Sequence, residues 1–207
     1  MRLVAESFAW PFRGSGRSAW ALGLLTVLLV PLLFIPLLGY AIEATRAAEA
    51  GAQGPPAWRL SVRLLTDGLW TSLAVLLIAL PFALVLNPLA STLRALGEPN
   101  AHIIAFFALA LPWGLVSLLL MPHTTAGFAA SGRPRDLFNF AAALSGVRRD
   151  FMTWNVAAAA IVTGWAIGLA CAGVLCVGVV PGVFYAILVS AHAAAALPRE
   201  DPRPSAR

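Results

Sequence analysis

Two stretches of this chain, residues 69–86 and 103–121, contain no ionisable side chain. Each is close to the roughly 20 residues that an α-helix needs to cross the hydrocarbon core of a bilayer. The composition agrees, because 60% of the residues are hydrophobic and 11% are charged, whereas soluble domains are about 25% charged. The sequence therefore predicts an all-α, polytopic membrane protein in which both stretches are full spans.

A third apolar region, residues 155–197, is too long for one span. As a single straight helix it would measure about 65 Å, twice the hydrocarbon thickness. The segment Gly178 to Gly182 favours a turn, because its glycines permit unusual backbone angles and Pro181 removes a helix hydrogen bond. We expect two spans, residues 156–177 and 182–197, which brings the full spans of the helical bundle to four.

The first apolar segment, residues 18–42, is interrupted by Pro31 and Pro36. It either crosses as a kinked span or enters the membrane and returns, with its apex at residues 30–36. In the re-entrant topology every arginine except Arg94 lies on one side, as the excess of basic residues in cytoplasmic loops favours. In the crossing topology the three arginines of the first 17 residues join Arg94 on the opposite side. The sequence leaves both topologies open.

The length of 207 residues suits one domain. We expect a single integral-membrane domain over residues 1–197 and a polar, disordered tail over residues 198–207. The first apolar segment is longer than the roughly 7 to 15 residues of a signal-peptide core, so we expect it to be retained.

Two amphipathic helices are expected to lie on the membrane surface. Over residues 134–151 apolar side chains recur at spacings of three and four, namely Leu137, Phe140, Leu144, Val147 and Phe151. Near anionic lipid each arginine contributes about 1 kcal/mol, and the arginines of this helix are Arg135, Arg148 and Arg149. A shorter helix is expected over residues 58–66, with Trp58, Arg59 and Arg63 at the interface.

The sequence contains no pattern typical of catalysis, cofactor binding or metal binding. We find no nucleophile beside a base, no glycine-rich phosphate loop and no paired carboxylates. Cys171 and Cys176 are five residues apart, so a helix would point them about 140° apart and exclude a shared metal. His192 lies within an apolar segment, and we expect its imidazole to bond a backbone carbonyl. The arginines are scattered among loops, which argues against nucleic acid as a partner.

A ridge of small side chains is predicted along the expected span of residues 156–177. Its members recur every fourth residue and are Ala160, Gly164, Gly168, Ala172 and Cys176. Such a ridge lets helix backbones approach closely in lipid. We expect it to pack inside the monomer, with dimerisation or binding of another protein as the alternative.

Six short motifs follow one another along nearly the whole chain. They are Trp10-Pro11-Phe12, Gly39-Tyr40, Pro56-x-Trp58, Asp67-Gly68, Phe184-Tyr185 and Ser190-Ala191-His192. In this order they resemble a bacterial and archaeal family of integral-membrane domains of unknown function. The resemblance implies a prokaryotic plasma membrane and no established activity. The family pattern places acidic residues after Pro-x-Trp, whereas Arg59 and Arg63 occupy that stretch here.

Two functions are consistent with these patterns. The first is a non-enzymatic, structural or accessory component of a membrane complex. The second is a subunit of a transporter or channel whose pathway uses the proline-broken helices, because discontinuous helices form binding sites in transporters. The predicted spans 69–86 and 103–121 contain no charged side chain of the kind that proton-coupled transporters use, so the first function is favoured.

Overall fold

The structure is a computed structural model that describes residues 2–13, 16–171 and 178–197. In these ranges the chain forms helices and no strand, which confirms the expected all-α fold. The elements are α1 (Arg2–Ala9), η1 (Trp10–Phe12), α2 (Gly16–Leu28), α3 (Val30–Glu49), α4 (Val62–Ala95), α5 (Ala101–Ser131), η2 (Pro134–Phe138), α6 (Phe140–Arg149), α7 (Phe151–Ala170) and α8 (Val179–Ala195). The tail expected to be disordered, residues 198–207, lies outside the described residues.

Four helices of the described chain are long and apolar enough to cross a membrane, namely α3, α4, α5 and α7. This finding supports the expected membrane insertion, although the set of spans differs from the predicted one. Helix α8 has 17 residues and is shorter than these four. Helix α3 joins them because it continues to Glu49, past the predicted end of the first segment at residue 42.

The first apolar segment folds back on itself. Its helix is interrupted at Leu29, where φ is −102° and ψ is 28°, so the break precedes Pro31. A second irregular residue, Leu33, has φ −112° and ψ 20°, and Pro36 follows three residues later as a residue that cannot donate a helix hydrogen bond. The indole Nε1 of Trp10 donates to the carbonyl of Ala52 at 2.9 Å. This bond joins the chain before α2 to the chain after α3, so the two ends of the segment lie together.

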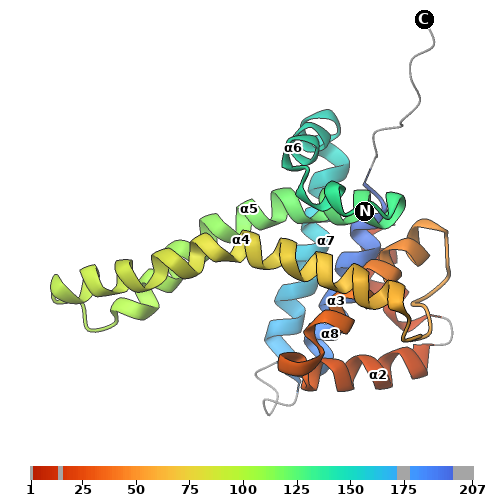
Figure 1. Cartoon of the computed structure of the whole chain (residues 1–207), viewed down its shortest axis with the longest axis horizontal. Coiled ribbons are helices and arrows are strands. Elements are labelled where there is room, and N and C mark those ends of the chain that lie inside the picture. Colours follow the sequence, from red (N-terminus) through yellow and green to blue (C-terminus); the bar gives the residue numbers. More distant parts are fainter. Residues whose placement is uncertain (1, 14–15, 172–177, 198–207) are drawn as a thin grey trace, which may run out of the picture.

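Helices α4 and α5 form a long hairpin that contains the predicted spans 69–86 and 103–121. At 1.5 Å per residue they are about 51 and 46 Å long. In Figure 1 the hairpin projects to the left from the remaining helices. Only its base, at the start of α4 and the end of α5, lies beside them.

The amphipathic helix expected over residues 134–151 is wrong as a single element. The structure divides it into η2 and α6, and assigns Phe151 to α7. Two side chains cause the divisions, because polar residues with short side chains are strong helix caps. The side chain of Asn139 accepts from the amide of Ala142 at 3.1 Å, and Asp150 accepts from the amide of Thr153 at 3.0 Å.

Helices α7 and α8 pack antiparallel, with Gly164 against Val189 and Gly168 against Gly182. The turn expected from Gly178 to Gly182 is wrong, because α8 already begins at Val179. Pro181 lies in the first turn of α8, where the helix needs no backbone donor. The residues between Cys171 and Gly178, which link these two helices in the sequence, lie outside the described residues.

Candidate functional site

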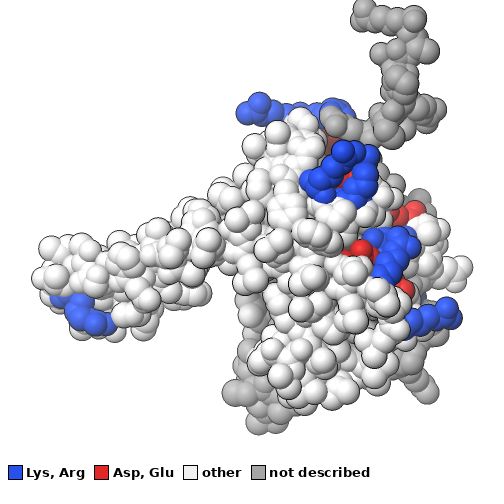
Figure 2. All heavy atoms as spheres, in the orientation of Figure 1, with Lys and Arg blue, Asp and Glu red and all other residues white. Residues whose placement is uncertain are grey.

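Charged side chains are distributed unevenly over the described surface. Figure 2 shows blue and red atoms along the upper and right-hand edges of the molecule, near α6 and the start of α4. A separate blue group lies at the far end of the α4–α5 hairpin, the end that carries Arg94. The visible surface between these regions is white, as expected for a surface that faces lipid. The base of the hairpin is therefore where charge and helix packing meet.

At this base α3 and α4 cross in backbone contact. A Cβ atom on Gly39 would overlap the carbonyl oxygen of Leu64, and one on Gly68 would overlap the carbonyl oxygen of Ile35. Any larger residue at either glycine would therefore separate the two backbones. The close crossing places Asp67, the neighbour of Gly68, directly against α3.

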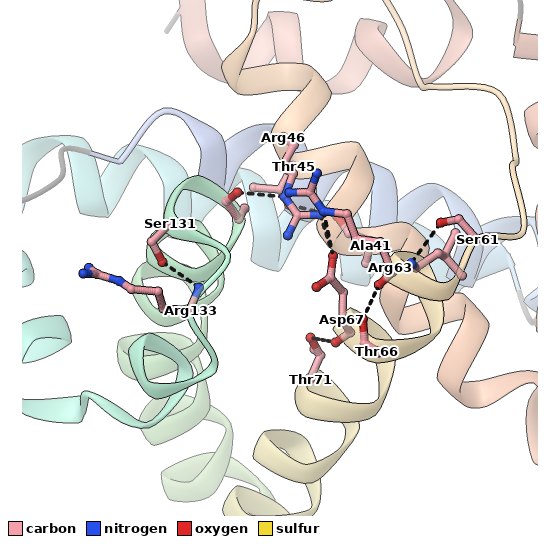
Figure 3. A network of polar contacts seen from close by, with 12 residues as sticks. Ala41, Thr45, Arg46, Ser61, Arg63, Thr66, Asp67, Thr71, Ser131 and Arg133 are labelled. Carbon is pink, nitrogen blue, oxygen red and sulfur yellow. Dashed lines mark hydrogen bonds and ion pairs between the residues drawn. The ribbon is translucent and has the colours of Figure 1, made fainter.

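Arg46 connects three helices at this crossing (Figure 3). Its Nη1 lies 2.6 Å from Oδ2 of Asp67 on α4, and its Nε donates to the carbonyl of Ala129 on α5 at 2.8 Å. Its guanidinium carbon lies 5.9 Å from the ring centroid of Phe128, which is within the range of cation–π attraction. Helices α3, α4 and α5 are thus joined through one side chain.

The Arg46–Asp67 pair is largely shielded from solvent. The exposed fraction of the side chain is 19% for Arg46 and 9% for Asp67. Arg63 lies 3.8 Å from the same carboxylate, but its side chain is 69% exposed, so solvent weakens that contact. The Nη2 atom of Arg46 is buried and has no hydrogen-bond partner among the described residues. These groups form what we term the base network: Arg46, Asp67, Arg63 and the carbonyl of Ala129.

Beside the base network, a second set of contacts fixes the exit from α5. The hydroxyl of Ser131 donates to Oδ2 of Asp136 at 2.5 Å, and Nη2 of Arg133 lies 3.2 Å from the same oxygen. Figure 3 shows Ser131 and Arg133 at the end of α5, apart from Asp67. The side chain of Arg133 is 55% exposed, so the Arg133–Asp136 pair is a surface counterpart of the Arg46–Asp67 pair.

Residues from five of the six sequence motifs meet in one aromatic cluster. Tyr40 and Trp58 stack with ring centroids 4.1 Å apart, and Tyr40 lies 5.9 Å from Phe184. Trp10 contacts the ring of His192 at 5.3 Å and is packed in the same hydrophobic cluster as Tyr40 and Phe184. The sixth motif, Asp67-Gly68, forms the α3–α4 crossing. The cluster therefore lies next to the base network along α3.

The interface residues expected near the start of α4 occupy different environments. Trp58 is half-buried and donates to the carbonyl of Ala19 at 3.0 Å, so it packs within the protein. Arg59 is exposed. The helix expected over residues 58–66 is wrong in its first half, because α4 begins at Val62 with Ser61 as its cap.

The remaining predicted residues lie away from the base network. Arg135, Arg148 and Arg149 are exposed on η2 and α6. Ala160, Gly164 and Gly168 are buried on α7, where both glycines face α8 inside the monomer. Ala172 and Cys176 lie outside the described residues. For His192 the expected backbone carbonyl is wrong, because Nδ1 lies 2.9 Å from the hydroxyl of Ser7 on α1.

The arrangement is suited to holding helices together. Among the described residues, no three His, Cys, Asp or Glu side chains are grouped as metal ligands. Arg63 is one helical turn from Asp67 in the sequence, whereas Arg46, which forms the shorter contact with Asp67, lies on another helix, and the sequence analysis did not identify it. The sequence signal that could have indicated this contact between helices is Gly39 and Gly68, since both belong to the sequence motifs.

Comparison with known proteins gives a family. A family model described as a protein of unknown function (DUF4013) matches residues 22–190. This match confirms the expected relationship to an uncharacterised family. No curated protein matches the chain, and no solved structure does.

Proposed function

The chain belongs to the DUF4013 family, whose function is unknown, and from that premise we propose a non-enzymatic scaffold in the prokaryotic plasma membrane. In this proposal the α4–α5 hairpin binds a transmembrane helix of another protein. The base network and the aromatic cluster hold the hairpin at a fixed position on the other helices.

The observation that supports the proposal is the isolation of the hairpin beyond its base. Residues 75–89 of α4 and 106–117 of α5 include no buried residue. Contacts in this part join the two helices of the hairpin, such as the Phe82 and Phe106 rings at 5.7 Å and the bond from Trp113 Nε1 to the carbonyl of Ile78 at 2.5 Å. Leu118 and Leu119, further along α5, already pack against a cluster that includes Val147 and Trp154. The chain thus builds two long helices and leaves their outer faces uncovered.

Lipid covers such apolar faces as well as protein does, so exposure alone does not identify a partner. The stiffness of the attachment is what favours a scaffold. A hairpin that only anchored the chain would not need a backbone-close crossing at Gly39 and Gly68 or an arginine joined to three helices. A surface held at a fixed angle reduces the entropy lost when a partner binds.

The test is purification of the full chain in mild detergent, followed by measurement of partner stoichiometry. We compare Leu84→Trp and Leu111→Trp on the hairpin with Leu32→Trp on α3 as the matched control, since these leucines are 65%, 78% and 81% exposed. A bulky indole at a protein interface should release the partner, whereas one facing lipid should be tolerated. A stoichiometric partner lost from the hairpin variants and kept by Leu32→Trp supports the scaffold. Equal retention in all three variants contradicts it.

A transporter or channel subunit is the second candidate, and the broken first segment favours it. The irregular backbone at Leu29 and Leu33 resembles the discontinuous helices that bind substrates in transporters. Uptake by the purified chain alone, reconstituted in vesicles, would support transport over the scaffold. Loss of that uptake in a variant with Leu33 replaced by proline, at unchanged protein yield, would place the pathway at the break.

A further inference from the structure

We propose that His123 of α5 is a pH-sensitive latch, which holds α6 on α5 while its imidazole is neutral and releases α6 when the imidazole is protonated. The contact is made with Gly146 of α6. A Cβ atom on this glycine would lie 2.6 Å from Cδ2 and 2.8 Å from Nε2 of the ring. The Nε2 edge of the imidazole therefore packs directly on the backbone of α6, with no space for a side chain between them.

Both ring nitrogens of His123 are buried without a hydrogen bond. Neither Nδ1 nor Nε2 is accessible to solvent, and neither has a partner among the described residues. In this position a neutral imidazole leaves one donor and one acceptor unpaired, whereas an imidazolium would leave two donors unpaired and add a charge. An unpaired charge is far more costly to bury than an unpaired polar atom. The closed contact is therefore compatible with the neutral ring alone.

No described carboxylate is paired with His123 to stabilise a protonated ring. Several elements pack against the half of α5 that is nearer the base of the hairpin. Their charged and titratable groups are the base network with Glu43 and Glu49 on α3 and α4, Arg135 and Asp136 on η2, Arg148 and Arg149 on α6, and His192 on α8. Among the described residues, none of these groups forms an ion pair or a hydrogen bond with His123. A proton on the ring would therefore be uncompensated until the contact opens.

The rest of the docked face of α6 is small and apolar. Ala143 and Val147 are its buried residues, and Val147 packs in one cluster with Trp154 of α7. An apolar side chain in place of His123 would fill the same space without unpaired polar atoms. The imidazole thus weakens the contact, and what it adds is a second charge state between about pH 5 and pH 8. Release would uncover Ala143 and Val147, while η2 and α7 keep α6 attached at its two ends.

The experiment measures the distance between α5 and α6 in the full chain as a function of pH. Spin labels are attached to Leu115→Cys on α5 and Ala141→Cys on α6, both exposed positions, in a chain without its native cysteines. The protein is held in nanodiscs of zwitterionic phosphatidylcholine, and the distance distribution is recorded by pulsed electron paramagnetic resonance. A single distance is expected at about pH 8. A second, longer distance should grow as the pH falls to about 5 and disappear when the higher pH is restored.

Two substitutions of His123 that differ in polarity identify the titrating group. His123→Leu fills the space without polar atoms and His123→Gln stays polar without titrating, so both should lose the longer distance at low pH. His102→Gln is the matched control, because His102 is exposed at the far end of the hairpin, and it should keep the full response. An unchanged distance distribution with His123 in place, or a response that persists in the His123 variants, would overturn the latch.

Discussion

Arg46→Gln should destabilise the protein far more than the same change at Arg133. Both arginines pair with one aspartate, but the Arg46 side chain is 19% exposed and that of Arg133 is 55% exposed. Removing Arg46 also removes the bond to the carbonyl of Ala129. The comparison therefore isolates the effect of burying a pair that joins three helices.

The magnitudes follow from the burial of the remaining partner. Removal of one member of a buried ion pair costs about 3 to 5 kcal/mol, because the other charge stays buried and unpaired. Among the described residues, Arg63 at 3.8 Å is the cation that Asp67 would keep, so we expect about 3 kcal/mol for Arg46→Gln, the low end of that range. An exposed pair contributes about 0 to 1 kcal/mol, which is the expectation for Arg133→Gln.

The free energy of unfolding is measured by titrating detergent-solubilised protein with sodium dodecyl sulfate and following circular dichroism. A double-mutant cycle with Asp67→Asn separates the pair from the other contacts of Arg46. We expect a coupling energy of about 2 kcal/mol between positions 46 and 67, within the range for residues in direct contact. Equal costs for Arg46→Gln and Arg133→Gln, or a coupling energy near zero, would refute the base network as a helix clamp.

Three further predictions follow. Gly68→Leu should abolish assembly or expression because its side chain would overlap the backbone of α3, whereas Gly114→Leu, whose Cβ would meet no atom within 4 Å, should be neutral by yield and thermal unfolding. In a chain without its native cysteines, a membrane-impermeant maleimide added outside should label Glu98→Cys at the hairpin end and spare Arg13→Cys, an exposed position before the first segment. Labelling of both would contradict the re-entrant topology, because only a crossing segment puts residue 13 and the hairpin end on the same side. Hydrogen bonds from the hydroxyl and amide of Thr153 lower the pKa of Asp150. The stability that the Asp150 carboxylate gives the folded protein is therefore present above the pKa of the unfolded state, and is lost as the pH falls through the lower pKa of the folded state. The temperature of thermal unfolding should therefore fall below about pH 4 in the unaltered chain and change less in Asp150→Asn.

The helical elements could be predicted where local composition decides them. Residues 69–86 and 103–121 lie within α4 and α5, because an uncharged stretch of that length is stable as a membrane helix whatever it packs against. The residues at which helices begin and end were harder to predict. The caps at Asn139 and Asp150 divide a pattern that is periodic over residues 134–151, since apolar spacing says nothing about a local side-chain bond to the backbone.

The candidate site depended on contacts between distant parts of the chain. Arg63 and Asp67 are one helical turn apart, so a contact between them is the one that sequence spacing can indicate. The shorter contact of Asp67 is with Arg46, and it exists only because Gly39 and Gly68 let α3 and α4 cross in backbone contact. An ion pair between helices therefore becomes predictable only once the small residues that set the crossing are recognised.

The same geometry bears on the side of the membrane that the base network faces. From Asp67 to Arg94 the helix rises about 40 Å, more than the roughly 30 Å of the hydrocarbon core, so α4 can place these charges in opposite interfaces. Helix α2 has 13 residues and rises about 20 Å, too little to cross, and Trp10 is bonded to Ala52 after α3. We therefore predict that the first segment returns to the side of the base network, where the partly shielded Arg46–Asp67 pair would avoid the cost of a charge at the bilayer centre.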